Sequence, residues 1–208
     1  MRRIIDLVFA GPTLICLSPI FLVVAILVKL QSPGPILYKA KRVGQYGHIF
    51  EMYKFRTMVA NADLFGQKLT AYCDPRITPI GFFLRRWKLD EIPQLVNIIK
   101  GEMSIIGPRP ESPAYVQYYT RNQQRVLHVR PGITGPSQFM NRNEEEKLRG
   151  KSDPEQFYIH ILMPEKLKID LEYIKTQTFY SDMLWIARTI LGIFISAVNS
   201  PSLLLIIC

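Results

Sequence analysis

The chain opens with an apolar run, and the rest alternates short apolar stretches with polar ones. From Ile4 to Leu30 nearly every residue is apolar, with Asp6, Pro12 and Pro19 as interruptions. As one straight helix this run would measure about 40 Å, more than the ~30 Å hydrocarbon core of a bilayer. We therefore predict a membrane helix over residues 1–31 and a separate folded domain over residues 32–208.

Basic residues flank the apolar run on both sides, so neither end favours crossing a membrane. The flanking residues are Arg2, Arg3, Lys29, Lys39, Lys41 and Arg42. Pro19 lies near the middle, where it removes a backbone donor and bends the helix, and the Ser18 hydroxyl is placed to bond a freed carbonyl. From these residues alone, a re-entrant helix and a kinked spanning helix fit equally well. A cleaved signal peptide fits less well, because no small-x-small site follows.

The remaining pattern predicts an α+β, mainly helical domain. Residues 36–38 and 49–53 read as strands of a short β-hairpin around a turn at 44–47. Thr78-Pro79 predicts a helix that begins there and runs to about Trp87. Residues 90–100 form the clearest helical pattern, ended by Gly101. Residues 61–72 read as a helix or loop, 107–110 and 130–135 as rigid loops, and 170–199 as one or two helices. We expect the amphipathic helices to lie at a membrane surface.

The charge balance limits the classes of binding partner that suit this chain. The 208 residues include 26 Lys+Arg and 17 Asp+Glu, a net charge of +9, and 48% are hydrophobic. A basic chain suits nucleic acid, anionic lipid or a phosphorylated substrate. Membrane contact together with phosphate binding explains both the charge and the hydrophobicity, so we expect no nucleic-acid partner. Cys16, Cys73 and Cys208 are too scattered for a disulfide framework or a zinc site.

Two adjacent acids, Asp90 and Glu91, stand out among basic residues. An isolated Asp-Glu pair at a helix start usually caps the helix. Here Arg85, Arg86 and Lys88 precede the pair, and Arg109 and Arg130 follow in proline-stiffened loops. Such a setting suits an aspartate that attacks phosphorus, a carboxylate that binds Mg²⁺, and arginines that clamp phosphate oxygens. The histidines are scattered, and neither a Gly-x-Ser-x-Gly elbow nor a Walker loop is present.

The order of several motifs resembles the monotopic phosphoglycosyl transferases of the bacterial sugar transferase family, and the resemblance covers nearly the whole chain. The motifs are Arg3-Ile4-Ile5-Asp6-Leu7, Ser18-Pro19, Gly34-Pro35-Ile36-Leu37-Tyr38, Arg42-Val43-Gly44, 53–58, 84–95, Asn97, 100–104, 106–110 and 130–135. The chain departs from the family after Gly135, where Pro136-Ser137-Gln138 stands in place of the usual Leu-Ala-Gln. It also lacks the extra N-terminal membrane domain of the larger relatives, so it resembles the minimal form.

The resemblance implies a reaction. A UDP-sugar would give its sugar-1-phosphate to a polyprenyl (undecaprenyl) phosphate, with release of UMP, as the first membrane step of surface-glycan assembly. Asp90 would be the nucleophile that forms a covalent aspartyl-phosphosugar, and Glu91 would bind Mg²⁺ as the cofactor. The implied phosphate-binding residues are Arg85, Arg109, Arg130, Arg142 and Lys54.

The resemblance also implies a location. Ser18-Pro19 matches the family's helix-breaking dipeptide, which favours the re-entrant reading and a monotopic enzyme at the cytoplasmic face of the bacterial inner membrane, in contact with membrane lipids. The sequence does not reveal the sugar or the oligomeric state. The alternative is a non-enzymatic membrane-anchored scaffold that binds anionic lipids, but it gives no reason for an Asp-Glu pair among arginines.

Overall fold

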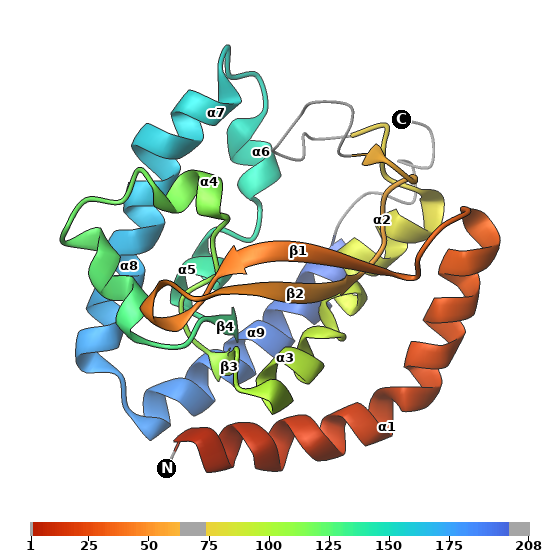
Figure 1. The fold of residues 1–208 in the computed structure, drawn as a ribbon, viewed down its shortest axis with the longest axis horizontal. Helices are drawn as coiled ribbons and strands as arrows, with labels where there is room; N and C mark the ends of the chain where they lie inside the picture. Colours follow the sequence, from red (N-terminus) through yellow and green to blue (C-terminus); the bar gives the residue numbers. More distant parts are fainter. Residues whose placement is uncertain (1, 63–73, 200–208) are drawn as a thin grey trace.

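The computed structural model describes residues 2–62 and 74–199 and shows a mainly helical α+β fold (Figure 1). The long helix α1 (Arg2–Gln31) runs along one edge of the molecule and bends near its middle. It leads into the antiparallel hairpin β1 (Leu37–Val43) and β2 (Ile49–Phe55), joined by the turn η1 (Gln45–Gly47). The hairpin is confirmed, and its strands extend beyond the predicted bounds.

Short elements follow the hairpin and carry the residues of chemical interest. They are α2 (Pro79–Arg86), η3 (Leu89–Glu91), α3 (Gln94–Lys100), β3 (Ser104–Ile106), α4 (Pro113–Val116), η4 (Gln123–His128), β4 (Gly132–Thr134), α5 (Pro136–Met140), α6 (Glu144–Leu148) and α7 (Pro154–Phe157). A π-helical turn, η5 (Tyr158–Leu162), leads into α8 (Met163–Thr176), and α9 (Phe179–Asn199) ends the described chain. The segment predicted at 61–72 lies largely outside the described residues.

Local signals set several of these boundaries as predicted. The Thr78 hydroxyl accepts a hydrogen bond from the Gly81 N–H at 3.1 Å and caps α2, with Pro79 at its first position. Gly101 ends α3 with a φ of 87°, which only glycine adopts freely. The stretch at 170–199 resolves into two helices, α8 and α9, separated at Gln177–Thr178.

Two features differ from the predicted pattern. The helix expected from Asp90 begins at Gln94, because Pro93 has no N–H to bond the Leu89 carbonyl. That carbonyl accepts from the Ile92 N–H instead, at 3.3 Å, which gives the tighter turn η3. The stretch 130–135, read as a loop, contains the strand β4, which pairs in parallel with β3 just before the other predicted loop, with Ser104 opposite Gly132.

Buried apolar side chains of the described residues form three clusters. One packs under α8. A second joins the hairpin, α3 and the N-terminal half of α1, where it includes Ala10. The third joins the C-terminal half of α1 to β2 and α2 through Val24, Phe55 and Leu84. Both halves of α1 therefore pack on the same folded body, one on each side of the bend.

Candidate active site

The turn η3 directs Asp90 inward. Lys88 has a φ of 55°, in the left-handed region, and reverses the chain between α2 and η3. Asp90 is consequently only 6% exposed, although it is a carboxylic acid. Within residues 2–62 and 74–199 its Oδ1 atom has no hydrogen-bond partner. A buried acceptor without a partner is costly, so this oxygen is an open position for a ligand or reacting atom.

Glu91 lies beside Asp90 and contacts two cations. Its Oε1 atom accepts from Lys54 Nζ at 2.8 Å and from Arg109 Nη2 at 3.3 Å. Burial opposes ionisation of the Glu91 carboxyl, but Lys54, Arg109 and Lys88 overcome it and hold the pKa of Glu91 far below its usual range. Glu91 is therefore a carboxylate at neutral pH.

Neighbouring cations also act on the Asp90 carboxyl. Burial raises the pKa of the Asp90 carboxyl, and neighbouring Glu91 raises it further, whereas Lys54, Lys88 and Arg85 lower it. Arg85 projects from α2, and its Nε donates to the Thr57 hydroxyl at 2.9 Å. Asp90 thus combines an oxygen that has no hydrogen-bond partner in the described residues with the nearby positive charges of Lys54, Lys88 and Arg85.

Lys54 reaches Glu91 because the end of β2 is fastened to α3. The fully buried Asn97 side chain accepts from the Tyr53 N–H at 3.0 Å and donates to the Glu51 carbonyl at 2.7 Å. Asn97 Nδ2 also donates to Glu102 at 2.7 Å. No role for Asn97 was predicted from the sequence. A polar residue between apolar Leu95 and Ile98 was the available signal.

Arg109 is held by a close approach of two loops. The Gly107 N–H donates to the Thr134 carbonyl at 3.0 Å, and the Gly132 N–H donates to the Pro108 carbonyl at 2.8 Å. A Cβ atom at Gly107 or Gly132 would collide with the backbone of the opposite loop. Glycine at these two positions therefore lets β3 and β4 pair and fixes the loop that carries Arg109.

The other two predicted phosphate-binding arginines lie in different surroundings. Arg130 is half-buried in the loop before β4. Arg142 is exposed, with its guanidinium 5.4 Å from the centre of the Phe139 ring and next to Gly192 of α9. The structure thus brings Lys54 and Arg109 into contact with Glu91 and places Arg85 near Asp90. Arg142 instead stacks against α5 and α9.

The carboxylate pair fits Mg²⁺ by its chemistry. No group of three or more His, Cys, Asp or Glu side chains gathers in the described part of the chain, so a metal site made wholly of protein side chains is not seen there. Mg²⁺ is commonly held by one or two carboxylates together with substrate phosphates and water. Ionised Glu91 and the open oxygen of Asp90 are donors of that kind.

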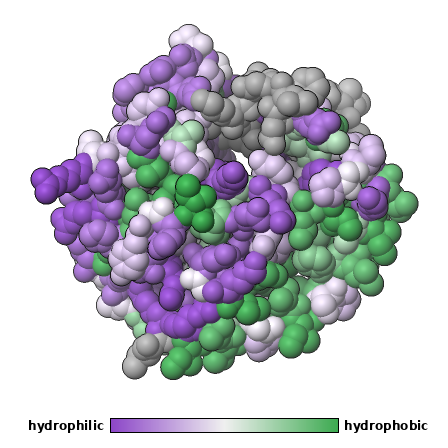
Figure 2. Space-filling model, viewed as in Figure 1, coloured by the Kyte–Doolittle hydropathy of each residue, from purple (hydrophilic) through white to green (hydrophobic). Residues whose placement is uncertain are grey.

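The bend of α1 has the cause predicted for it. Pro19 cannot donate to the Ile15 carbonyl four residues earlier, and the Ser18 hydroxyl donates to that carbonyl at 2.7 Å. By length and composition α1 could cross a membrane. Only 17% of its most apolar 18-residue stretch is buried inside the protein. Hydrophobic residues gather along the edge formed by α1, whereas mainly hydrophilic residues cover the region of the β-hairpin (Figure 2).

The amino-acid sequence is similar to those of several bacterial proteins. The chain is 34% identical to the UDP-N-acetylgalactosamine-undecaprenyl-phosphate N-acetylgalactosaminephosphotransferase of Aeromonas hydrophila, with 91% of this chain aligned to 43% of that protein. It is 34% identical to the exopolysaccharide production protein ExoY of Sinorhizobium fredii, over 94% of this chain and 86% of that protein. It is 43% identical to a putative undecaprenyl-phosphate N-acetylgalactosaminyl 1-phosphate transferase of Bacillus subtilis, over 74% of this chain and 82% of that protein.

The chain spans less than half of the Aeromonas protein but most of the other two. The family described as Bacterial sugar transferase matches residues 1–196, which include α1, Asp90, Glu91 and the arginine-bearing loops. The chain belongs to the bacterial sugar transferase family.

Proposed function

We propose that this protein transfers a sugar-1-phosphate from a UDP-sugar to undecaprenyl phosphate and releases UMP. The observation that carries the proposal is the buried Asp90 carboxyl, whose Oδ1 is open and surrounded by Lys54, Lys88 and Arg85. The relatives named above act on undecaprenyl phosphate or produce exopolysaccharide according to their names, which supports the acceptor. The product would begin the assembly of a surface glycan.

The first step uses Asp90 as the nucleophile. A carboxylate oxygen of Asp90 attacks the phosphorus that bears the sugar, the bond from that phosphorus to the bridging oxygen breaks, and UMP leaves with the electron pair. This step produces an aspartyl-phosphosugar. Arg85 and Arg109, and on this proposal Lys54 and Arg130, hold the phosphate oxygens as charge shifts toward UMP. On the same proposal Arg142 would join them by leaving the Phe139 ring, against which it stacks in the structure.

The second step regenerates Asp90. A phosphate oxygen of undecaprenyl phosphate attacks the same phosphorus, and the bond to Asp90 breaks to give a polyprenyl-diphosphate-sugar. Mg²⁺, held by Glu91, would neutralise phosphate charge when bound. Lys54 and Arg109 keep Glu91 ionised and in place.

The membrane helix would bring the lipid to the site from one side of the bilayer. Arg3 and Asp6 tie the start of α1 to α3 and β3, and Phe21 packs on Phe55 with ring centres 4.6 Å apart beyond the bend. Both ends of α1 therefore lie on one body, which fits a re-entrant helix and a monotopic enzyme on the cytoplasmic face. Exposed apolar residues on other helices would touch the same lipid surface: Phe82 and Phe83 on α2, and Leu184, Leu191 and Ile195 on α9.

Release of UMP by the detergent-solubilised protein tests the reaction. The assay contains Mg²⁺, undecaprenyl phosphate and a panel of UDP-sugars, beginning with UDP-N-acetylgalactosamine because two relatives carry that sugar in their names. UMP release with one donor, absent in Asp90→Asn, supports the proposal. Retention of that release in Asp90→Asn would contradict it. Binding of anionic vesicles without turnover of any donor would favour the lipid-binding scaffold.

A double substitution tests the topology. Ser18→Ala with Pro19→Ala restores the missing backbone donor and should straighten α1, so that the N-terminus crosses the membrane. Cysteine labelling of the N-terminus from each side of the membrane measures this change. An N-terminus that stays on the original side in the double variant would contradict the role given to these residues.

A further inference from the structure

Asp6 is an acidic residue in an otherwise apolar membrane helix, and the proposed reaction gives it no task. Its side chain is 4% exposed. One oxygen, Oδ1, accepts from the Ser104 hydroxyl at 2.8 Å and from the Ile105 N–H at 3.0 Å. Acidic residues in membrane helices are costly, and those that persist usually serve function. Through this one oxygen, Asp6 binds the first two residues of β3.

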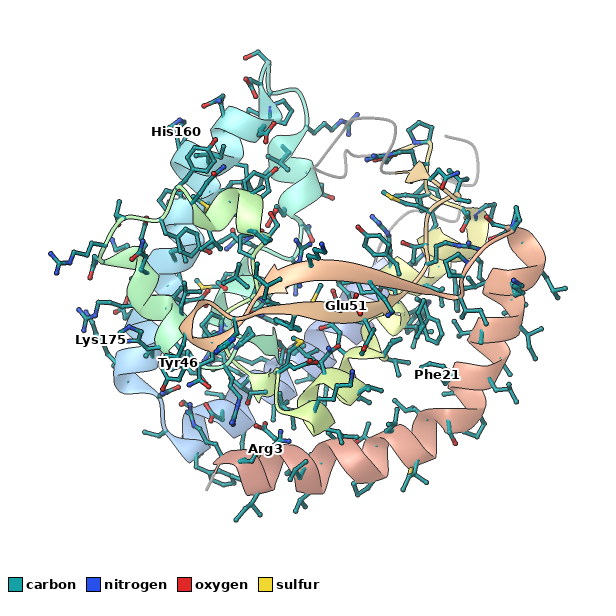
Figure 3. All side chains as sticks on the ribbon, viewed as in Figure 1. Arg3, Phe21, Tyr46, Glu51, His160 and Lys175 are labelled. Atoms are coloured by element: carbon teal, nitrogen blue, oxygen red, sulfur yellow. The ribbon has the colours of Figure 1, made fainter. Side chains whose placement is uncertain are left out.

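Arg3 lies one turn earlier on the same face of α1 (Figure 3). Its guanidinium donates to the Ile98 carbonyl and, at 2.7 Å, to the Ile99 carbonyl. These carbonyls belong to the last turn of α3, where carbonyls lack the usual donors four residues later, and the Ile98 carbonyl also accepts from the Gly101 N–H at 2.9 Å. The first two turns of α1 therefore bind the end of α3 through Arg3 and the start of β3 through Asp6.

The two elements held in this way carry the two sides of the candidate site. Helix α3 begins three residues after Glu91, so its position sets that carboxylate. Strand β3 runs into the glycine-paired loop that carries Arg109, and the pairing of Gly107 with Thr134 makes strand and loop one stiff unit. The contact between Arg109 and Glu91 thus depends on the position of β3, and the hydrogen bonds of Asp6 fix that position.

We infer that Asp6 is a positioning residue that acts through Arg109. It fixes β3 to the membrane helix and so holds the Arg109 guanidinium in reach of Glu91 and of the substrate phosphate. The position of α1 in the bilayer and the position of Arg109 in the site then depend on each other. This inference rests on the proposed transferase function, because its consequence is measured on that reaction.

Three variants separate positioning from general damage. Asp6→Ala removes the acceptor and leaves Ser104 and Ile105 unpaired. Asp6→Asn keeps an oxygen at the same place, and because both donors are neutral it should preserve both bonds. Val8→Ala, on the exposed side of the same turn, is the control for changes in helix hydrophobicity. We expect Asp6→Ala to lower kcat/KM for the UDP-sugar about 10- to 100-fold, and the other two variants to stay within about threefold of wild type.

A double-mutant cycle with Arg109→Ala shows whether Asp6 acts through Arg109. If it does, Asp6→Ala costs little further activity in the Arg109→Ala background. Hydrogen exchange gives a readout that does not need turnover: the amides of residues 104–109 should exchange faster in Asp6→Ala but not in Asp6→Asn. Equal losses of activity in both backgrounds, or unchanged exchange at 104–109, would overturn the inference. If wild type released no UMP with any donor, but the amides of residues 104–109 still exchanged faster in Asp6→Ala than in wild type, the result would count against the proposed function and not against this contact.

Discussion

Two surroundings of buried acids in the described part of the chain, the Asp90 cluster and the Asp170 cluster, differ in their charges. Asp90 and Asp170 are 6% and 3% exposed, and each has an Oδ1 atom without a hydrogen-bond partner among the described residues. Cations surround Asp90, and its neighbour Glu91 pairs with two of them. Asp170 on α8 instead accepts one hydrogen bond from the Ser137 hydroxyl at 2.8 Å.

The cation that lowers the pKa of Asp170, Lys166, is engaged with other groups. Lys166 donates to Glu144 at 2.8 Å and to the Tyr158 hydroxyl at 3.1 Å. Burial therefore raises the pKa of Asp170 to about 7, against the smaller opposing effects of Ser137 and Lys166. Burial raises the pKa of both Asp90 and Asp170, but Lys54, Lys88 and Arg85 oppose this effect at Asp90, and cations hold the neighbouring Glu91 ionised. The surrounding charge, and not the depth of burial, distinguishes the candidate site.

The largest effect should come from Asp90→Asn. The amide is close in shape to the carboxyl but cannot form the acyl-phosphate bond to the phosphosugar, so turnover should fall by about 10³-fold or more. The matched change in the other cluster, Asp170→Asn, should leave turnover within about threefold of wild type. The rate of UMP release by both variants measures the contrast, and similar losses in the two would erase the distinction drawn between the clusters.

Lys54→Met should have the next largest effect. It leaves the Glu91 carboxylate buried with Arg109 as its remaining direct cation, and removal of one member of a buried pair costs about 3 kcal/mol. Both the melting temperature and the rate of UMP release should decrease. Lys39→Met, which breaks an exposed pair with Glu51, is the control and should change neither. A Lys54→Met protein as stable as wild type would show that the cations are not needed to keep Glu91 buried.

Asp170 should appear in the pH dependence of stability. Its pKa rises from 3.8 to about 7 on folding, so the folded protein binds more protons than the unfolded chain between these values. Stability contributed at this site therefore falls as pH rises from about 4 to 7. Asp170→Asn removes the titration, so the fall in melting temperature from pH 5 to pH 8 should be smaller than in wild type. An unchanged pH dependence would contradict the raised pKa.

Ser137→Ala should produce the smallest change. The Ser137 hydroxyl contributes one hydrogen bond to Asp170, and alanine removes it without adding bulk. Its loss should cost about 1 kcal/mol of stability and should steepen the same pH dependence, because the pKa of Asp170 loses an interaction that lowers it. Melting temperatures of the variant at pH 5 and pH 8 measure this. A pH dependence flatter than wild type would contradict the assignment.

The features that sequence predicted correctly are those with local causes. The Thr78-Pro79 cap, the Gly101 stop and the bond from Ser18 to the carbonyl freed by Pro19 each involve residues within four positions of one another. The acidic pair Asp90 and Glu91 could be picked out because the two acids are adjacent and Arg85, Arg86 and Lys88 precede them, but their catalytic roles stay predictions.

Long-range contacts were not readable in the same way. The pairing of β3 with β4, the clamp of Asn97 on β2 and the bonds of Asp6 to β3 join residues 28 to 99 positions apart. No local pattern specifies such partners, and short strands such as Ser104–Ile106 carry too little alternation to be recognised. The site's geometry depends on these contacts, so the sequence indicated its chemistry but not its construction.

The central claim is that Asp90 carries the phosphosugar, and intact-protein mass spectrometry tests it most directly. The protein is incubated with its UDP-sugar and Mg²⁺ without undecaprenyl phosphate, and the adduct is mapped by digestion. We expect a mass increase of one phosphosugar on the peptide that contains Asp90, its loss on addition of undecaprenyl phosphate, and no adduct in Asp90→Asn. Full turnover without any adduct on that peptide, or an adduct that persists in Asp90→Asn, would contradict the account.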